Sequence, residues 1–160
     1  MDFQLTETGV DQAHKISKEL SDLNIDFDKI YTSPLSRATD TAIIIAKHCG
    51  VDKDNIIILN DLTGCGGGDL EGKPYSEWYA TPTEKLVNEH GAERYTNQRK
   101  RIGRAILDII KTADCCKKSV VVSHSSVFQV IQAINNGIED ETETFKQNKL
   151  GSGEYTEIIL

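Results

Sequence analysis

The hydrophobic pattern of the chain alternates between two spacings. Four stretches carry apolar residues three or four positions apart, which is the spacing of one helix face: residues 6–23, 38–50, 93–112 and 125–134. Four shorter stretches are rich in β-branched residues, as buried strands are: residues 29–32, 55–59, 120–123 and 153–160. Because helices alternate with strands, the sequence predicts an α/β fold, a three-layer α/β/α sandwich with a mainly parallel sheet. We expect Tyr31, Ile57 and Val121 to lie in neighbouring strands.

The segments between these elements carry less information. Residues 61–73 form a glycine-rich loop without the Gly-Lys-Ser/Thr spacing of a P-loop. Residues 74–90 predict short helices that break near Thr81 and Pro82. Within the helix of residues 93–112, a run of basic side chains is interpreted as a solvated face rather than an anion site: Arg94, Arg99, Lys100, Arg101 and Arg104.

Candidate chemistry gathers where the strand of residues 120–123 ends. His124 follows that strand, and Ser125 and Ser126 are good N-cap residues for the helix that comes next. Ligands bind at the carboxyl ends of parallel strands, and a helix N-terminus favours an anion, phosphate above all. The alternative is a histidine that only satisfies a hydrogen bond at the strand end.

Composition narrows the class of protein. The chain has 160 residues, enough for one domain, and its net charge of −7 argues against a nucleic-acid partner. No stretch has the length of a transmembrane helix or the pattern of a signal peptide, so we expect a cytoplasmic protein without a membrane partner. The four cysteines show no Cys-x-x-Cys spacing, so we expect free thiols, no metal site and no cofactor.

Four stretches, in order along the chain, resemble the histidine phosphatase (phosphoglycerate mutase-like) superfamily. Residues 5–13 (LTETGVDQA) resemble that family's LTxxGxxQA segment, and residues 33–42 (SPLSRATDTA) resemble its SPLxRAxxTA segment. Residues 68–72 (GDLEG) resemble the end of its ERxxGxxEG loop, and residues 121–124 (VVSH) resemble its VSHG segment. The resemblance implies a pocket for a phosphoryl group, with His124 as the catalytic candidate and Arg37 and Ser125 as substrate-binding candidates.

The chain departs from the family pattern at the residues that would carry the chemistry. The 160 residues contain no Arg-His-Gly, the motif whose histidine attacks phosphorus in the family. Gly64 stands where the family has its acid–base glutamate, Cys65 where it has the neighbouring arginine, and Ser125 where a glycine follows the second histidine. We therefore expect residues 1–160 to form a single but incomplete domain, truncated at the first, central strand and at the last.

Two kinds of function follow from this pattern. As an enzyme, the chain would be a phosphomonoester hydrolase (phosphatase) or a phosphomutase, impaired or inactive as it stands because the nucleophile and the acid are absent. The alternative is a catalytically dead phosphoester-binding module, or a gene remnant. The expected partner is a small phosphorylated metabolite or phosphate. Because a missing strand leaves unpaired edges, the final strand should pair with the strand of residues 120–123, or the chain should form a homo-oligomer.

Overall fold

The computed structural model describes residues 2–114, 117–146 and 149–159. Within these ranges, three strands form a parallel sheet in the order β2-β1-β3. They are β1 (Phe27–Thr32), β2 (Ile56–Ile58) and β3 (Lys118–Val122). Tyr31 of β1 pairs with Ile57 on one side and with Val121 on the other, as predicted. The parallel sheet of the predicted α/β fold is therefore confirmed.

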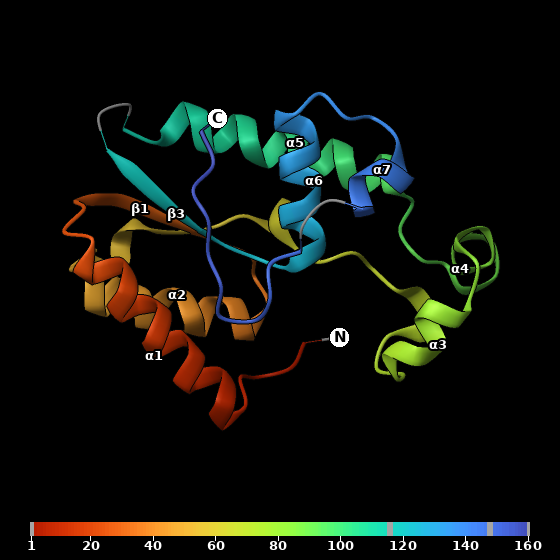
Figure 1. Ribbon diagram of the computed structural model, residues 1–160, viewed down its shortest axis with the longest axis horizontal. Helices are drawn as coiled ribbons and strands as arrows, with labels where there is room; N and C mark the ends of the chain where they lie inside the picture. Colours follow the sequence, from red (N-terminus) through yellow and green to blue (C-terminus); the bar gives the residue numbers. More distant parts are fainter. Residues whose placement is uncertain (1, 115–116, 147–148, 160) are drawn as a thin grey trace.

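Helices cover both faces of the sheet. The longer ones are α1 (Glu7–Asp22), α2 (Ser36–Cys49), α5 (Tyr95–Thr112) and α6 (Ser125–Asn135). The shorter ones are α3 (Tyr75–Ala80), α4 (Thr83–His90) and α7 (Glu141–Lys146), with 3-10 turns at Lys53–Asn55, Asn60–Leu62 and Gly68–Leu70. Figure 1 shows α1 and α2 on one side of the sheet, α5 and α6 on the other, and α3 and α4 set apart at one end. The α/β/α layering is as predicted, and the helices of residues 74–90 break where the sequence indicated.

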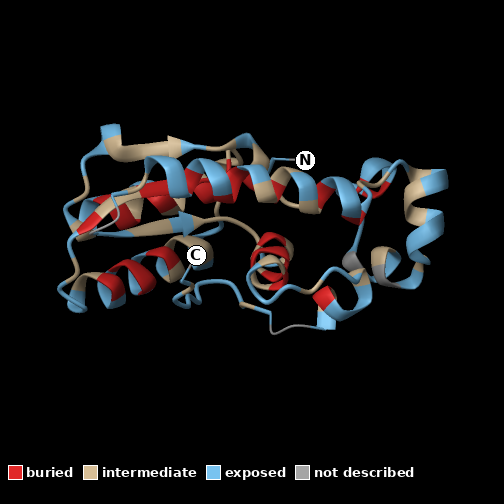
Figure 2. Cartoon of the chain, turned by 90° about the horizontal axis from the view of Figure 1, so that it is seen from above, coloured by how far each residue is buried: buried red, intermediate tan, exposed pale blue. Residues whose placement is uncertain are grey.

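Side-chain alternation along β1 separates two hydrophobic clusters. Ile30 points into a cluster with α1 and α2, whereas Tyr31 points into a cluster with α5 and α6, and both are fully buried. Successive residues of a strand face opposite sides of a sheet, so a central strand between two layers needs apolar residues on both of its faces, as Ile30 and Tyr31 provide. Figure 2 shows buried residues lining the core between the sheet and its helices, and within α4 no residue is buried.

Local signals set the helix ends on one side of the sheet. Thr6 caps α1, with its Oγ1 accepting a hydrogen bond from the Gly9 N–H at 3.1 Å. Gly50 ends α2 with a φ of 71°, the left-handed conformation that glycine adopts without steric cost. Both ends lie where the sequence placed them.

The predicted final strand is wrong. Residues 154–159 have no strand conformation, and within the described chain they form no ladder with β3. The segment crosses β3 in the view of Figure 1, and side chains link it to the rest of the chain. Glu157 pairs with Lys118 at 2.5 Å, and Ile158 packs against the hydrophobic cluster under α5 and α6. Since these contacts do not use the backbone of the segment, no strand forms. The alternative, a homo-oligomer at this edge, stays a prediction.

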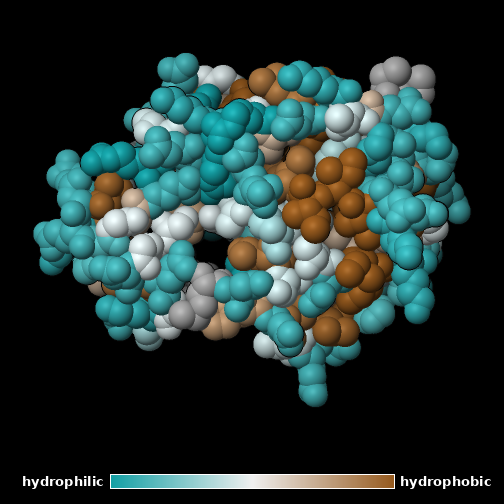
Figure 3. Space-filling view, turned by 180° about the vertical axis from the view of Figure 1, so that it is seen from behind, coloured by the Kyte–Doolittle hydropathy of each residue, from teal (hydrophilic) through white to brown (hydrophobic). Residues whose placement is uncertain are grey.

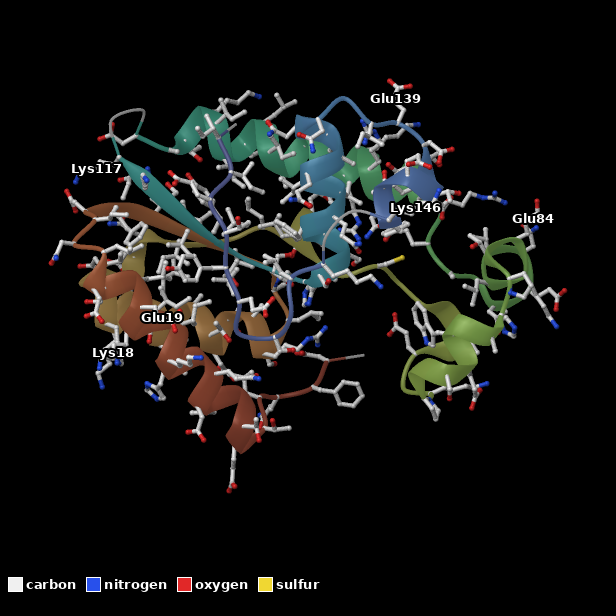
Figure 4. All side chains as sticks on the ribbon, in the orientation of Figure 1. Lys18, Glu19, Glu84, Lys117, Glu139 and Lys146 are labelled. Atoms are coloured by element: carbon white, nitrogen blue, oxygen red, sulfur yellow. The ribbon has the colours of Figure 1, made fainter. Side chains whose placement is uncertain are left out.

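Charged side chains lie on the surface, and apolar side chains gather on one part of it. Figure 4 labels charged residues that are all exposed: Lys18, Glu19, Glu84, Lys117, Glu139 and Lys146. On the face seen in Figure 3, hydrophobic side chains gather on the half away from α3 and α4. Across the described residues, no helix combines the length and the apolar character needed to cross a bilayer.

Candidate phosphate-binding site

Two strand ends meet at the candidate site. Thr32, at the end of β1, pairs with Val122, at the end of β3. Beyond that pair, the Ser33 N–H donates to the Val122 carbonyl at 3.0 Å. His124 follows β3 closely and Arg37 lies in the first turn of α2, so both leave the carboxyl edge of the sheet. Arg37 Nη2 lies 3.4 Å from His124 Nδ1, so the two residues expected to share a site are in contact.

The imidazole of His124 is held between a cation and a hydroxyl. A guanidinium can only donate, so His124 Nδ1 accepts from Arg37 and Nε2 carries the proton. Nε2 donates that proton to Oγ of the fully buried Ser33 at 2.9 Å. Burial, together with the charges of Arg37 and then Arg101, lowers the pKa of His124 from 6.5 to about 4. The ring is therefore neutral at pH 7, and Arg37 supplies the positive charge.

Arg37 keeps one nitrogen without an acceptor. Its Nη1 is buried and, within the described part of the chain, has no hydrogen-bond partner. A buried donor left unpaired costs about 1–3 kcal/mol, and more when it is charged. An anion beside Arg37 and His124 would remove this cost with a charge-assisted hydrogen bond.

A carboxylate from the N-terminal segment occupies the start of α2. Leu35, the N-cap residue of α2, has no polar side-chain atom. Asp2 takes that role, accepting from the Ser36 N–H at 2.8 Å and from the Ser36 hydroxyl at 2.6 Å. The hydroxyl bond is the main reason that the pKa of Asp2 lies below its ordinary value, and the charge of Arg37 acts in the same direction. This acidic cap fixes the first turn of α2, from which Arg37 projects.

The predicted caps of α6 are wrong by one residue. The helix begins at Ser125, and His124 is its N-cap in an extended conformation (φ −122°, ψ 154°). Because His124 is itself extended and the helix starts directly after it, His124 takes the N-cap position that was predicted for a serine. Ser125, the third predicted site residue, is exposed at the helix start. The first N–H groups of α6 lie beside the imidazole without intrahelical partners.

The glycine-rich loop packs against His124 from another direction. A Cβ added to Gly64 would lie 3.3 Å from Cγ of His124, so the loop backbone packs on the ring. Burial raises the pKa of the neighbouring Cys65 thiol to about 11, which keeps it protonated. Glu71 Oε1 accepts from the Gly67 N–H at 3.2 Å, so this carboxylate stabilises the loop. None of these groups is an acid poised beside the imidazole.

The same loop also carries the α3–α4 segment. Trp78 of α3 donates from Nε1 to the Leu70 carbonyl at 2.9 Å. Its ring lies so close to Gly67 that a Cβ there would come within 1.8 Å of Cζ2. A Cβ on Gly68 would lie 1.8 Å from the His90 carbonyl oxygen, and Gly68 has a φ of 55°. The loop is rich in glycine because two helices approach its backbone this closely.

Arg101 is a site residue that the sequence pattern missed. Its side chain is 13% exposed and pairs with Glu93, Nε to Oε1, at 2.7 Å. The prediction of a solvated basic face is therefore wrong for Arg101. It holds for the exposed members of the run, which are Arg94, Lys100 and Arg104. One signal existed: Gln98 and Ala105, three positions before and four after, are buried, so Arg101 borders the core-facing side of α5.

Another concave surface lies apart from this pair. A cavity of about 330 Å³ opens between α4, α5 and α7. Its lining residues are Thr83, Glu84, Val87, Asn88, Arg94, Tyr95, Thr96 and Glu141. Neither Arg37 nor His124 lines it. Over the ranges that the structure describes, no group of three or more His, Cys, Asp or Glu side chains is arranged to hold a metal ion.

Comparison with known proteins agrees with this geometry. The profile of the histidine phosphatase superfamily (branch 1) matches residues 1–158. Because this match covers nearly the whole chain, the chain belongs to the histidine phosphatase superfamily.

Similar proteins include named phosphatases. The mitochondrial serine/threonine-protein phosphatase PGAM5 of Mus musculus is 27% identical over 164 residues, covering 99% of this chain and 51% of PGAM5. Phosphoglycerate mutase-like protein 4 of Arabidopsis thaliana is 35% identical over 77 residues, which are 48% of this chain and 32% of that protein. The chain thus spans about half the length of PGAM5.

Solved structures share the fold. The mycobacterial glucosyl-3-phosphoglycerate phosphatase superposes with a TM-score of 0.78 at 19% identity, over 96% of this chain and 78% of that one. The same mycobacterial protein has been solved in complex with inorganic phosphate, and this form superposes with a TM-score of 0.76 at 19% identity. That complex covers 95% of this chain and 78% of its own. These similarities extend the predicted fold over nearly the whole chain.

Proposed function

We propose that the edge formed by Arg37 and His124 binds the phosphoryl group of a small phosphomonoester, or inorganic phosphate. The observation that carries this proposal is the buried Arg37 Nη1, which has no acceptor within the described residues and lies on the guanidinium that contacts His124. A phosphate oxygen is the acceptor that such a donor favours, because the bond is then charge-assisted on both sides. The N–H groups at the start of α6 add donors of the same kind.

The imidazole contributes to such a site in two protonation states. Neutral His124 already uses Nδ1 and Nε2 on Arg37 and Ser33. A phosphate dianion close to the ring favours the imidazolium, so its binding should raise the pKa of His124 above about 4. The bound anion would then take over the contact with Arg37, and a protonated Nδ1 would donate to phosphate instead.

We further propose that the 160-residue chain by itself has little or no turnover. Hydrolysis of a phosphomonoester needs a nucleophile in line with the leaving oxygen and an acid that protonates that oxygen. Arg37 and the α6 N-terminus only stabilise charge on the phosphoryl oxygens. At the place of the family's acid, Gly64 has no side chain, and the 160 residues lack the Arg-His-Gly nucleophile. Positioning and charge stabilisation without a nucleophile leave only a residual rate.

The names of the relatives support the phosphoryl-binding part of the proposal. PGAM5 is named a protein phosphatase, and the mycobacterial enzyme, named a phosphatase, was solved with inorganic phosphate. A cytoplasmic location stays a prediction, because the PGAM5 relatives are named mitochondrial.

Two measurements on the purified chain test the proposal. The first is phosphate binding followed by NMR chemical shifts at pH 7, and the second is steady-state hydrolysis of a generic aryl phosphate. We expect measurable phosphate binding that Arg37→Ala weakens by about 10- to 100-fold, since hydrogen bonds to charged groups contribute about 1.5–3 kcal/mol each. Lys47→Ala is the matched control, because it removes one positive charge from the exposed far end of the same helix.

Each outcome separates the candidate functions. Robust hydrolysis that is abolished by His124→Ala would contradict the proposed lack of turnover, and it would require a nucleophile in the chain, for which His124 would be the first candidate. Equal loss of binding in Arg37→Ala and Lys47→Ala would show attraction by net charge without a site. A wild-type chain that binds no phosphate would favour a remnant without a ligand.

A further inference from the structure

We propose that Arg101 is a positioning residue that holds the loop backbone of residues 61–64 against His124. This inference deepens the proposed phosphate site and rests on it for its functional meaning. The geometry that supports it is a guanidinium whose every N–H is used, with most of its bonds directed at one short stretch of backbone.

Arg101 satisfies all of its donors without water. An arginine side chain carries five N–H donors in a rigid fork. Nε and Nη2 donate to the two carboxylate oxygens of Glu93 at 2.7 and 2.8 Å. Nη1 donates to the carbonyls of Asp61 and Thr63 at 2.7 and 2.6 Å, and Nη2 also reaches the Gly64 carbonyl at 3.1 Å. Five donors thus meet five acceptors, three of which are carbonyls of the loop.

The remaining carbonyl of this stretch is fixed from the opposite direction. Ser123, the residue before His124, donates from Oγ to the Leu62 carbonyl at 2.7 Å. The Leu62 side chain is fully buried in the cluster under α5 and α6. The loop backbone is therefore held between Arg101 of α5 and Ser123 at the end of β3. It cannot slide along the imidazole unless one of these side chains releases it.

Glu93 closes the arrangement on the far side of Arg101. Besides its ion pair with Arg101, Glu93 donates from its backbone N–H to the Gly66 carbonyl at 2.8 Å. Its carboxylate balances the charge of Arg101 and so offsets the desolvation cost of burying most of the guanidinium. Arg104, one turn further along α5, is 62% exposed, and among the described residues it bonds only the side chain of Asp61. Arg101 therefore bonds the backbone of the loop, whereas Arg104 bonds a side chain.

A fixed loop has a measurable consequence at His124. Gly64 packs on the ring, which keeps water from this side, and burial is the main reason that the pKa of His124 lies near 4. The groups that act on the ring by charge are Arg37 and Arg101, with Glu93 paired to Arg101. Loss of Arg101 both frees the loop and removes a positive charge, and both changes raise the pKa of His124.

The experiment compares substitutions at Arg101 and Arg104 in the full chain. NMR titration gives the pKa of His124, whose signal is assigned by its loss in His124→Gln, and phosphate titration gives the affinity. We expect Arg101→Gln to raise the pKa of His124 by about one unit or more and to weaken phosphate binding by about fivefold or more. Arg101→Lys keeps the charge but has fewer donors in no fixed fork, so its pKa should fall between those of the wild type and Arg101→Gln. Arg104→Gln should leave both quantities at their wild-type values.

The readouts keep the two proposals apart. A folded Arg101→Gln chain with an unchanged His124 pKa and unchanged phosphate affinity would overturn the positioning role. If Arg101→Gln does not fold, Arg101→Lys decides the question: a wild-type pKa together with wild-type affinity would overturn the proposal. If the wild type binds no phosphate, the proposed function fails, but the response of the His124 pKa to Arg101 still decides the positioning role.

Discussion

His124 is held by two kinds of structure, one on its sheet side and one on its loop side. On the sheet side, Ser33 and Arg37 reach the ring from the end of β1 and the start of α2, and the β1–β3 ladder fixes their distance. On the loop side, Gly64 reaches the ring from a segment without ladder bonds, which Arg101 and Ser123 hold by its carbonyls. The sheet side depends on backbone pairing, whereas the loop side depends on a few side chains.

The two sides also differ in the chemistry they offer. The sheet side provides a charge and a hydroxyl, which are the groups that recognise a phosphoryl oxygen. The loop side provides backbone and a protonated thiol, and no group that transfers a proton to a leaving group. In the proposed phosphate site, the sheet side would therefore supply the groups that recognise the phosphoryl group, while the loop side would support the imidazole.

The largest expected loss of stability comes from a substitution in the glycine-rich loop. Gly68→Ala places a Cβ 1.8 Å from the His90 carbonyl oxygen at a φ of 55°. Because both the left-handed backbone and the steric overlap are costly, we expect a loss of about 3 kcal/mol in the free energy of unfolding. Trp78, the only tryptophan of the chain, packs on the adjacent Gly67, so its emission should shift to the red.

A second glycine provides the control for this loss. Gly91 has a φ of 68° but nothing within 4 Å of the position of a Cβ. Gly91→Ala should therefore cost only the conformational part, about 1 kcal/mol. Urea titration of both variants measures the difference. Equal losses would mean that the close approach of α4 to Gly68 does not contribute to stability.

The sequence predicted the sheet side better than the loop side, for a physical reason. Apolar runs place Arg37 and His124 after strands that were predicted to be neighbours, and parallel strands bring their carboxyl ends to one edge. That rule predicts that the two residues lie at one edge of the sheet, whereas their contact at 3.4 Å is seen only in the structure. The caps of α6 were missed by one residue, because an extended histidine can itself be the N-cap.

The loop side could not be predicted from spacing. The three carbonyls bonded by Arg101 lie about forty residues earlier in the chain, and carbonyls carry no sequence signal. Residues 154–159 contain the β-branched and aromatic residues that are common in strands, but a strand also requires a partner for its backbone. In both cases the outcome depends on contacts between residues that lie far apart in the sequence.

A smaller effect tests the sheet side. Ser33 is fully buried and accepts from His124 Nε2, so Ser33→Ala leaves the N–H of the ring without its acceptor. We expect a loss of about 1–3 kcal/mol in the free energy of unfolding, which is the cost of a buried unpaired donor. In Thr39→Ala, the lost hydroxyl bond joins Thr39 to the Ser36 carbonyl within α2, and the cost should stay below about 0.5 kcal/mol. Thermal unfolding of both variants decides whether the Ser33 bond holds the ring.

The last effect depends on pH and reports on both sides together. The pKa of His124 is about 4 in the folded chain and near its ordinary value of 6.5 when the chain is unfolded. The unfolded chain therefore binds a proton first as the pH falls, so the folded state loses stability between pH 6.5 and pH 4. At pH values well above 6.5 the ring is neutral in both states, and this contribution to the pH dependence vanishes.

Comparison with His124→Gln isolates this contribution. Asp2 and Asp28 also have lowered pKa values, but both remain in the variant, so their acid titration cancels in the difference between the two chains. We expect the unfolding free energy of the wild type to fall more steeply than that of His124→Gln from pH 6.5 to pH 4, and the two curves to run parallel above pH 6.5. Arg37→Gln should raise the pKa of His124 in the folded chain, because Arg37 is the stronger of the two charges that lower it. The pH range in which the folded state loses stability should therefore end at a higher pH than in the wild type. Parallel curves over the whole range would mean that the ring titrates normally in the folded chain, and then neither side of His124 keeps water from it.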